Sequence, residues 1–187
     1  FMRLIVGISG ASGVLMGYRL LQVLQQMENC ETHLVISESA ADNFEHEMGM
    51  DYHQIIALAD HYHAIHNMAA SISSGSFKTD GMIICPCSMK TLSAVANGFE
   101  VNLLIRAAGV CLKESRRVVL VPREMPMSSI HIRNMLTAAT SGCVIVPPML
   151  TFYNNAATLE AQVTHVLGKV LMQFGLDMPR FVPWEGV

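Results

Sequence analysis

The 187-residue sequence has few charged and few aromatic residues, 14% and 6% of the chain, while 51% of its residues are hydrophobic. Twelve basic and 15 acidic residues give a net charge of −3, and the sequence contains no run of Lys or Arg. Proteins that bind nucleic acid or anionic membrane surfaces usually carry such a basic patch. The composition therefore argues against a nucleic-acid or membrane partner and favours one compact globular domain.

Long hydrophobic runs are also missing, because no uninterrupted run approaches the ~18 residues that a membrane-spanning helix needs. The mean hydropathy is nevertheless high, at +0.37, and the chain has 14 methionines, which are typical of adaptable apolar surfaces. So few charges leave little polar surface to cover a monomer. We therefore expect part of the apolar surface to lie between the subunits of a homo-oligomer.

The five cysteines lack the spacing of a disulfide framework or a redox motif. Cys85 and Cys87 flank a proline without C-x-x-C spacing, and the others are isolated. An odd number of scattered cysteines favours free thiols in a reducing compartment. We therefore expect a cytoplasmic protein, with Cys85 and Cys87 as core residues rather than a redox pair.

Short apolar runs that favour strands alternate with helical patterns along the chain. The runs lie at residues 4–8, 34–36, 82–85, 118–121 and 144–146. Near-continuous apolar strands are typical of a parallel sheet that is covered on both faces. Five β–α alternations predict an α/β fold, a single domain over residues 1–187 with a doubly wound parallel sheet. Residues 177–187 are predicted to form a C-terminal arm.

In a doubly wound sheet, ligands bind beyond the carboxyl ends of the strands. The first such turn, Gly-Ile-Ser-Gly-Ala-Ser-Gly at residues 7–13, suits a cradle for a nucleotide or flavin, although a plain tight turn also uses Gly and Ser. Its glycine spacing differs from the G-x-G-x-x-G dinucleotide fingerprint. Ser37 and the Ser88–Thr91 segment place hydroxyls after two further strands, where Ser37 could equally be only a helix cap.

Arg123 and Glu124 follow the fourth predicted strand, at the same edge of the sheet. An Arg beside a carboxylate can hold a phosphate and pass a proton. His61, His63 and His66 could suggest a metal site, but nothing in the sequence brings these three side chains to one point. We therefore predict no metal site, and we interpret the irregular segment 61–79 as a functional or interface loop.

Taken together, the residues resemble the UbiX-type flavin prenyltransferase family, long described as small subunits of aromatic-acid decarboxylases. The resemblance covers nearly the whole chain and is carried by GISGASG at 7–13, ICPCSMKTLSAVANG at 84–98, LKE at 112–114, LVPREMPMSSIHIRNML at 120–136 and FY at 152–153. It implies a flavodoxin-like subunit in a homododecamer, with flavin mononucleotide (FMN) and the prenyl substrate bound at subunit interfaces.

The resemblance also implies the reaction, a metal-independent transfer of a dimethylallyl group from dimethylallyl monophosphate to N5 and then C6 of reduced FMN. The prenylated FMN would serve a UbiD-type decarboxylase. The residues that it implies for FMN binding are Gly10, Ala11, Ser12, Ser37, Ser88, Met89, Thr91, Arg106 and Arg123. Those implied for the prenyl phosphate and its pocket are Ser74, Lys113, Arg123, Tyr153 and Lys169. The implied catalytic residues are Glu124, Glu47 and Ser12, with Glu124 moving a proton to the departing phosphate.

Three positions depart from the family pattern. Lys169 replaces an Arg, Gly109 replaces an acidic residue, and Leu15-Met16 replaces a more polar or aromatic pair. We interpret these changes as tuning of an active enzyme.

Two alternatives are an FMN-dependent cysteine decarboxylase and a non-catalytic flavin-binding accessory subunit. The sequence lacks the motif of the cysteine decarboxylases, because PCSMKT stands in place of their PASANT-like segment. The presence of Glu124, Lys113 and Arg123 argues against an accessory subunit, since storage of a flavin requires no second phosphate site beside an acid.

Overall fold

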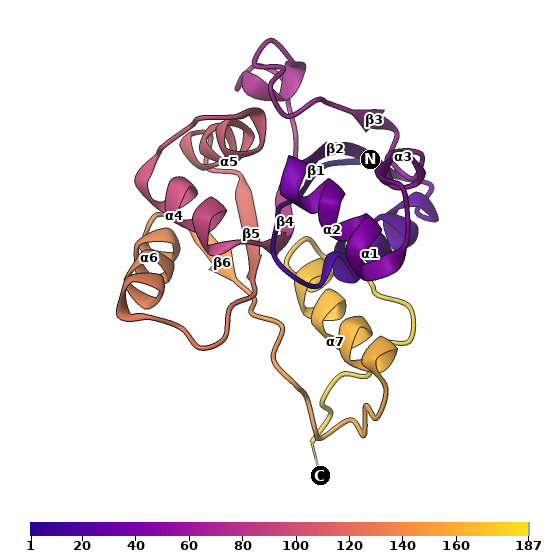
Figure 1. The fold of residues 1–187 in the computed structure, drawn as a ribbon. Coiled ribbons are helices and arrows are strands. Elements are labelled where there is room, and N and C mark those ends of the chain that lie inside the picture. The colour runs from indigo at the N-terminus through magenta and orange to yellow at the C-terminus, as the bar shows by residue number, and fades with distance from the viewer. Residues whose placement is uncertain (187) are drawn as a thin grey trace.

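The computed structural model describes residues 1–186 and consists of one sheet with helices on both faces (Figure 1). The strands are β1 (Met2–Ile8), β2 (Cys30–Ile36), β3 (His61–Tyr62), β4 (Gly81–Cys87), β5 (Arg117–Pro122) and β6 (Cys143–Ile145). The helices are α1 (Val14–Gln25), α2 (Glu38–Met48), α3 (Tyr52–Ile56), α4 (Met89–Asn97), α5 (Leu103–Lys113), α6 (Ser129–Thr140) and α7 (Leu159–Met172), with a 3₁₀ turn at Ser71–Ser73.

All strand pairs are parallel, and the strand order is β3-β2-β1-β4-β5-β6. Without the two-residue β3, this order is that of flavodoxin-like folds. The order reverses between β1 and β4, so the carboxyl ends of these two strands flank the crevice where such folds bind ligands. The predicted fold class is confirmed.

The near-continuous apolar character of the strands follows from burial on both faces. Alternate strand residues such as Leu4 and Val6 pack against α1, α2 and α7, while Ile5 and Met82 pack against α4 and α5 (Figure 1). Gly17 lets α1 approach closely, since a Cβ there would come within 2.6 Å of the Cys85 carbonyl oxygen.

The segment 61–79 is more ordered than the sequence suggested. His61 and Tyr62 form β3, which pairs with His33 and Leu34 of β2, and Ser71–Ser73 form the 3₁₀ turn. Two exposed residues carry no alternation of polar and apolar side chains, so only the pairing with β2 reveals this strand. The expectation of five β–α alternations missed it for this reason.

The C-terminal arm runs beside α7 as irregular chain, with Phe181 packed against that helix (Figure 1). Residue 187, the last residue of the predicted arm, lies outside the described residues. Among residues 1–186, no helix has both the length and the hydropathy needed to cross a bilayer.

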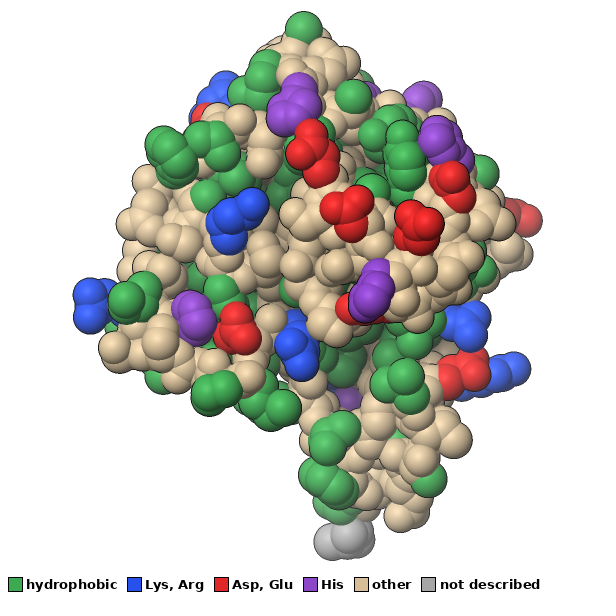
Figure 2. All heavy atoms as spheres, in the orientation of Figure 1, with side chains coloured by type: hydrophobic (Ala, Val, Ile, Leu, Met, Phe, Trp, Pro, Cys, Tyr) green, Lys and Arg blue, Asp and Glu red, His purple; other side chains and the backbone are tan. Residues whose placement is uncertain are grey.

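Large apolar side chains remain exposed on several elements. Figure 2 shows them over α6 and over the segment between β6 and α7. On α6, Ile130, Ile132 and Leu136 are 60%, 56% and 64% exposed. A surface of this kind is typical of protein–protein contact.

Candidate active site

The turns that follow β1 and β4 are joined through Ser9, a residue that is almost fully buried. The Ser9 Oγ accepts a hydrogen bond from the Ser88 backbone N–H at 2.8 Å and lies 3.3 Å from the Pro86 carbonyl oxygen. The two strands therefore hold their turns in a fixed relative position at the switch point of the sheet.

Three helices begin at one cavity of about 670 Å³. Ser37, Ser88 and Asn102 are the N-caps of α2, α4 and α5, and their side chains accept hydrogen bonds from Ala40, Thr91 and Ile105. All three caps line this cavity, which we name the hydroxyl-lined cavity; its wall also includes Gly10, Ser39, Lys90, Thr91 and Ser93. Helix N-termini carry partial positive charge and free N–H groups, so the cavity suits a ligand with a phosphate.

Gly10 brings the first turn close to the start of α2. A Cβ at residue 10 would overlap the Cβ of Ser39. The predicted cradle therefore depends on a glycine at this position, because a side chain would separate the turn from α2.

Glu47, near the end of α2, caps the N-terminus of α1. Its Oε2 accepts hydrogen bonds from the backbone N–H groups of Gly13 and Val14 at 2.9 and 3.3 Å. A carboxylate is favourable at this end of a helix, and α1 has no side-chain cap of its own. Glu47 therefore fixes the turn that carries Ser12.

A second cavity, of about 630 Å³, borders the same turn at Ser12 and Gly13. Ser12, Glu47, Arg123 and Gln162 contribute polar side chains to its wall. The rest of the wall is largely apolar and includes Leu15, Met16, Met48, Met149, Leu150, Val163 and Val166. We name it the apolar cavity. Leu15 and Met16, the pair that differs from the family pattern, thus form part of the wall of a cavity that suits a small hydrocarbon group.

Arg123 and Glu124 leave β5 at the same edge of the sheet. The Arg123 backbone N–H donates to the Cys87 carbonyl oxygen at 3.3 Å, which joins this segment to the end of β4. The half-buried Glu124 carboxylate accepts a hydrogen bond from the Met125 backbone N–H at 3.1 Å.

Lys113, Arg106 and Ser74 form a separate group beside the 3₁₀ turn. The Arg106 Nε donates to the Ser73 carbonyl oxygen at 3.0 Å, and Lys113 pairs with Glu114 next to Gly75. These residues do not line either cavity within one chain.

Gly109, which stands where the family pattern has an acidic residue, makes room for a carboxylate from elsewhere in the chain. A Cβ at residue 109 would overlap the carboxylate of Glu100, and Glu100 accepts a hydrogen bond from the Arg106 Nη1 at 2.6 Å. Glu100 therefore supplies the negative charge beside Arg106 that an acidic residue at position 109 could provide.

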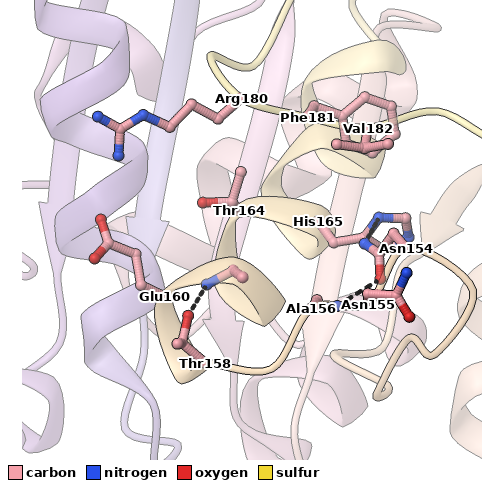
Figure 3. Close-up of a pocket in the computed structure, with 11 residues that line it drawn as sticks. Asn154, Asn155, Ala156, Thr158, Glu160, Thr164, His165, Arg180, Phe181 and Val182 are labelled. Carbon is pink, nitrogen blue, oxygen red and sulfur yellow. Dashed lines mark hydrogen bonds between the residues drawn. The ribbon is translucent and has the colours of Figure 1, made fainter.

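Tyr153 and Lys169 meet the C-terminal arm. Tyr153 packs edge-on against Trp184, with ring centroids 5.3 Å apart, and the Lys169 Nζ lies 5.7 Å from the centre of the Phe181 ring. His165 lies between Asn154 and Phe181 (Figure 3) and is 7% exposed. Burial lowers the pKa of His165, and the charge of Lys169 lowers it further. The imidazole thus joins the arm to α7.

The two cysteines of β4 are core residues, as predicted. Cys85 and Cys87 are fully buried among apolar side chains. Burial raises the pKa of both thiols, so neither forms a reactive thiolate.

One chain thus brings together only some of the residues expected at the site. Gly10, Ser37, Ser88 and Thr91 line the hydroxyl-lined cavity, and Ser12, Glu47 and Arg123 line the apolar one. Ala11 is buried in the turn after β1, and Met89 is buried at the start of α4. Glu124 follows β5 and lines neither cavity. The remaining candidates lie beside the 3₁₀ turn, on α5, in the β6–α7 segment and on α7; they are Ser74, Arg106, Lys113, Tyr153 and Lys169.

Sequence reasoning missed four residues that shape the site. Ser9 lies inside the quoted glycine turn, Lys90 is the second residue of α4, Asn102 is the N-cap of α5, and Glu100 precedes α5. The cap positions could have been found, since Asn before an apolar helical pattern is a standard N-cap signal. The roles of Ser9 and Glu100 depend on contacts between distant segments.

The comparisons with known proteins agree with this geometry. Residues 2–174 match the flavoprotein family. A probable UbiX-like flavin prenyltransferase of Sedimentibacter hydroxybenzoicus is 61% identical over 185 residues, which are 99% of this chain and 98% of the relative.

Two solved structures extend the likeness to three dimensions. A dodecameric, FMN-dependent UbiX-like decarboxylase from Escherichia coli O157:H7 is 51% identical, with a TM-score of 0.97 over 99% of this chain and 100% of the other. A UbiX protein in complex with FMN and dimethylallyl pyrophosphate is 45% identical, with a TM-score of 0.96 over 100% and 98% of the two chains.

A peptidyl-cysteine decarboxylase, by contrast, is only 15% identical at a TM-score of 0.62, and therefore shares the fold alone. With its near-complete likeness to the prenyltransferases, this chain belongs to the flavoprotein family, among the UbiX-like flavin prenyltransferases.

Proposed function

We propose that this chain transfers the dimethylallyl group of dimethylallyl monophosphate to N5 and C6 of reduced FMN, and that its two cavities divide the substrates between them. The observation that carries the proposal is their arrangement. A cavity with three helix N-termini and a mostly apolar cavity both border one turn, Gly10–Gly13. The first suits a phosphorylated nucleotide, and the second suits a short hydrocarbon chain.

The residues present fit FMN. The hydroxyl-lined cavity has a volume of about 670 Å³, within the roughly 300–1,000 Å³ of typical small-molecule sites. Its caps and the Lys90 ammonium offer N–H donors and positive charge for the phosphate, and Thr91 adds a hydroxyl. We assign Gly10, Ala11, Ser12, Ser37, Ser88, Met89 and Thr91 to FMN binding, with Arg106 and Arg123 at its margins.

Reduced FMN supplies the nucleophilic atoms N5 and C6. In the transfer to N5, the bond between C1 of the dimethylallyl group and the phosphate oxygen breaks while a C–N bond forms. Phosphate leaves poorly unless its charge is matched and a proton is supplied. In this proposal Arg123 holds the phosphate, Glu124 delivers the proton, and Glu47 positions the turn that presents Ser12 to the reacting atoms.

The remaining phosphate ligands come from neighbouring copies of the chain. Lys113 and Ser74 lie away from both cavities of their own chain, while Tyr153 and Lys169 lie at the arm. The exposed apolar side chains of α6 and of the β6–α7 segment provide the contact surfaces for a homo-oligomer. The dodecameric relative supports a dodecamer as the assembly.

The protein as a whole is proposed as one flavoprotein domain over residues 1–187, with residues 177–187 as its arm. All five cysteines carry free thiols, which supports a cytoplasmic location. Prenylated FMN is expected to pass to a UbiD-type decarboxylase.

The test is an anaerobic incubation of the purified protein with reduced FMN and dimethylallyl monophosphate, followed by mass spectrometry of the extracted flavin. We expect a gain in mass of one dimethylallyl unit, and no gain when the prenyl phosphate is omitted. A parallel reaction with the diphosphate separates the two possible donors. Bound but unmodified flavin with both donors would contradict the proposal and favour a flavin-binding accessory subunit.

A further inference from the structure

Four polar side chains gather at the β3 edge of the sheet, on one face. Glu31 and His33 belong to β2, and His61 of β3 pairs directly with His33. His63 follows two residues later, at the position where side chains of a strand return to the same face. Neither cavity of the proposed active site includes these residues.

Three of these residues present ligand atoms to a common point. One atom from each of Glu31, His33 and His61 lies within 4.8 Å of the others. The His33 Nε2 lies 2.8 Å and the His61 Nε2 3.9 Å from the Glu31 Oε1. Zinc bonds of about 2.0–2.2 Å place tetrahedral ligand atoms roughly 3.3–3.6 Å apart. The observed separations lie on either side of this spacing, so small side-chain rotations would suffice.

We propose that Glu31, His33 and His61 form a binding site for Zn²⁺ or a similar first-row divalent metal. Two imidazoles and a carboxylate are a common ligand set for such ions, which leaves a further position for water. Hard ions such as Mg²⁺ prefer sites made only of oxygen atoms and fit this set poorly. Side-chain exposures of 54% for His61 and 21% for Glu31 leave the site open to solvent.

His63 acts on the site through His33. The His63 Nε2 lies 2.8 Å from the His33 Nδ1, and the two rings are stacked. A histidine that binds a metal through Nε2 usually donates its Nδ1–H to an acceptor, which fixes the orientation of the ring. His63 can be that acceptor when its own proton lies on Nδ1. Binding then needs only a change of tautomer in both rings, with no net release of protons from them.

Arg3 competes with the metal and sets the affinity. Its Nε donates to the Glu31 Oε1 at 2.6 Å, and its guanidinium lies 4.7 Å from the centre of the Phe77 ring. A bound cation must share the Glu31 carboxylate with this fixed positive charge. We therefore expect weaker binding than at a dedicated zinc site, and tighter binding when Arg3 is replaced by an uncharged residue.

A metal at this position would tie β3 to β2. β3 has only two residues, both exposed, and it lies at the end of the sheet. A ligand that binds only the folded chain stabilises it according to its concentration and dissociation constant. Zinc is therefore expected to raise the melting temperature without taking part in prenyl transfer.

The experiment is a titration of the tag-free, metal-free protein with Zn²⁺ by calorimetry, with Co²⁺ absorption as a spectroscopic check of tetrahedral coordination. We expect one ion per chain. His61→Ala should weaken binding about tenfold or more. Because the His61 side chain is exposed, the variant is expected to fold like the parent. His66→Ala is the matched control, since His66 is exposed in the same segment and pairs with Glu38 instead.

Arg3→Gln provides a second, opposite readout, because it should tighten binding while a non-specific surface site would not respond. Absence of saturable binding to the parent would overturn the site, as would equal binding by the His61→Ala and His66→Ala variants. Prenyl transfer is measured in parallel and should be unaffected by His61→Ala, so failure of this site and failure of the proposed activity are distinguishable.

Discussion

Arg123 and Glu124 show how adjacent residues can take complementary roles. The backbone of Arg123 is bonded to the end of β4, and its side chain lines the apolar cavity. Glu124 is half-buried, with its carboxylate bonded to the next backbone N–H. In the proposed mechanism, this short segment provides both the charge that holds the phosphate and the acid that assists its departure.

Replacement of Glu124 by Gln tests the proton transfer. The amide keeps the size of the side chain but cannot deliver a proton, so single-turnover prenyl transfer should slow by about 10²- to 10⁴-fold. Binding of FMN, followed by absorbance titration, should remain at the parental level because Glu124 does not line the hydroxyl-lined cavity. An unchanged transfer rate would remove Glu124 from the mechanism.

Lys169→Arg tests the position on α7 where this chain has a Lys and the family pattern has an Arg. A guanidinium can make two parallel hydrogen bonds to a phosphate, whereas an ammonium acts as a point charge. We expect a lower KM for dimethylallyl monophosphate with little change in kcat, measured under anaerobic steady-state conditions. Lys169→Met, which has no charge, should raise the KM. Equal KM values in all three proteins would show that residue 169 does not contact the phosphate.

Among the elements, α7 and the C-terminal arm depend on a close approach. A Cβ at Gly168 would overlap the ring of Phe181, and that ring also stacks on His165. The same helix carries Lys169, so the position of the arm and the orientation of the Lys169 side chain are linked. A glycine inside a helix lowers the stability of the helix by about 1 kcal/mol relative to alanine. The packing of Phe181 against Gly168 offsets this cost.

Gly168→Ala should therefore displace the arm. We expect faster tryptic cleavage at Arg180, which lies within the arm, and a raised KM for the prenyl phosphate with unchanged FMN affinity. Met172→Ala, at an exposed position on the same helix, is the control and should behave like the parent. Cleavage of Gly168→Ala at the parental rate would show that the arm does not depend on this contact.

In the whole molecule, the candidates for binding the prenyl phosphate lie apart within one chain, which fits the proposed homo-oligomer. Lys113 and Ser74 do not line the apolar cavity of their own chain. The exposed apolar residues of α6 offer a surface on which another copy can pack.

Leu136→Asp tests this surface. A charge buried in an apolar contact is strongly unfavourable, so the variant should dissociate into smaller species in size-exclusion chromatography with light scattering. Prenyl transfer should fall together with the molecular mass. Gln25→Asp, which adds the same charge at an exposed position on α1, should leave the mass unchanged. A parental mass for Leu136→Asp would place the subunit contacts elsewhere.

The fold class, the ligand-binding edge of the sheet and the N-cap hydroxyls could be predicted from local patterns in the sequence. Strand and helix periodicity, glycine turns and cap residues act over a few neighbouring positions, so Gly10, Ser37 and Ser88 could be predicted from their surroundings. The motifs also identified the family. The burial of Cys85 and Cys87 followed from their place in an apolar strand.

Contacts between residues that are distant in the sequence became visible only in the folded chain. The pairing of β3 with β2 brings His61 to Glu31 and His33, although 28 residues separate His61 from His33, and the H-x-H-x-x-H spacing alone gave no reason to expect this site. In the same way, Glu100 occupies the space that Gly109 leaves. Such contacts depend on strand order and helix packing, which local patterns do not encode and which the folding of the whole chain establishes.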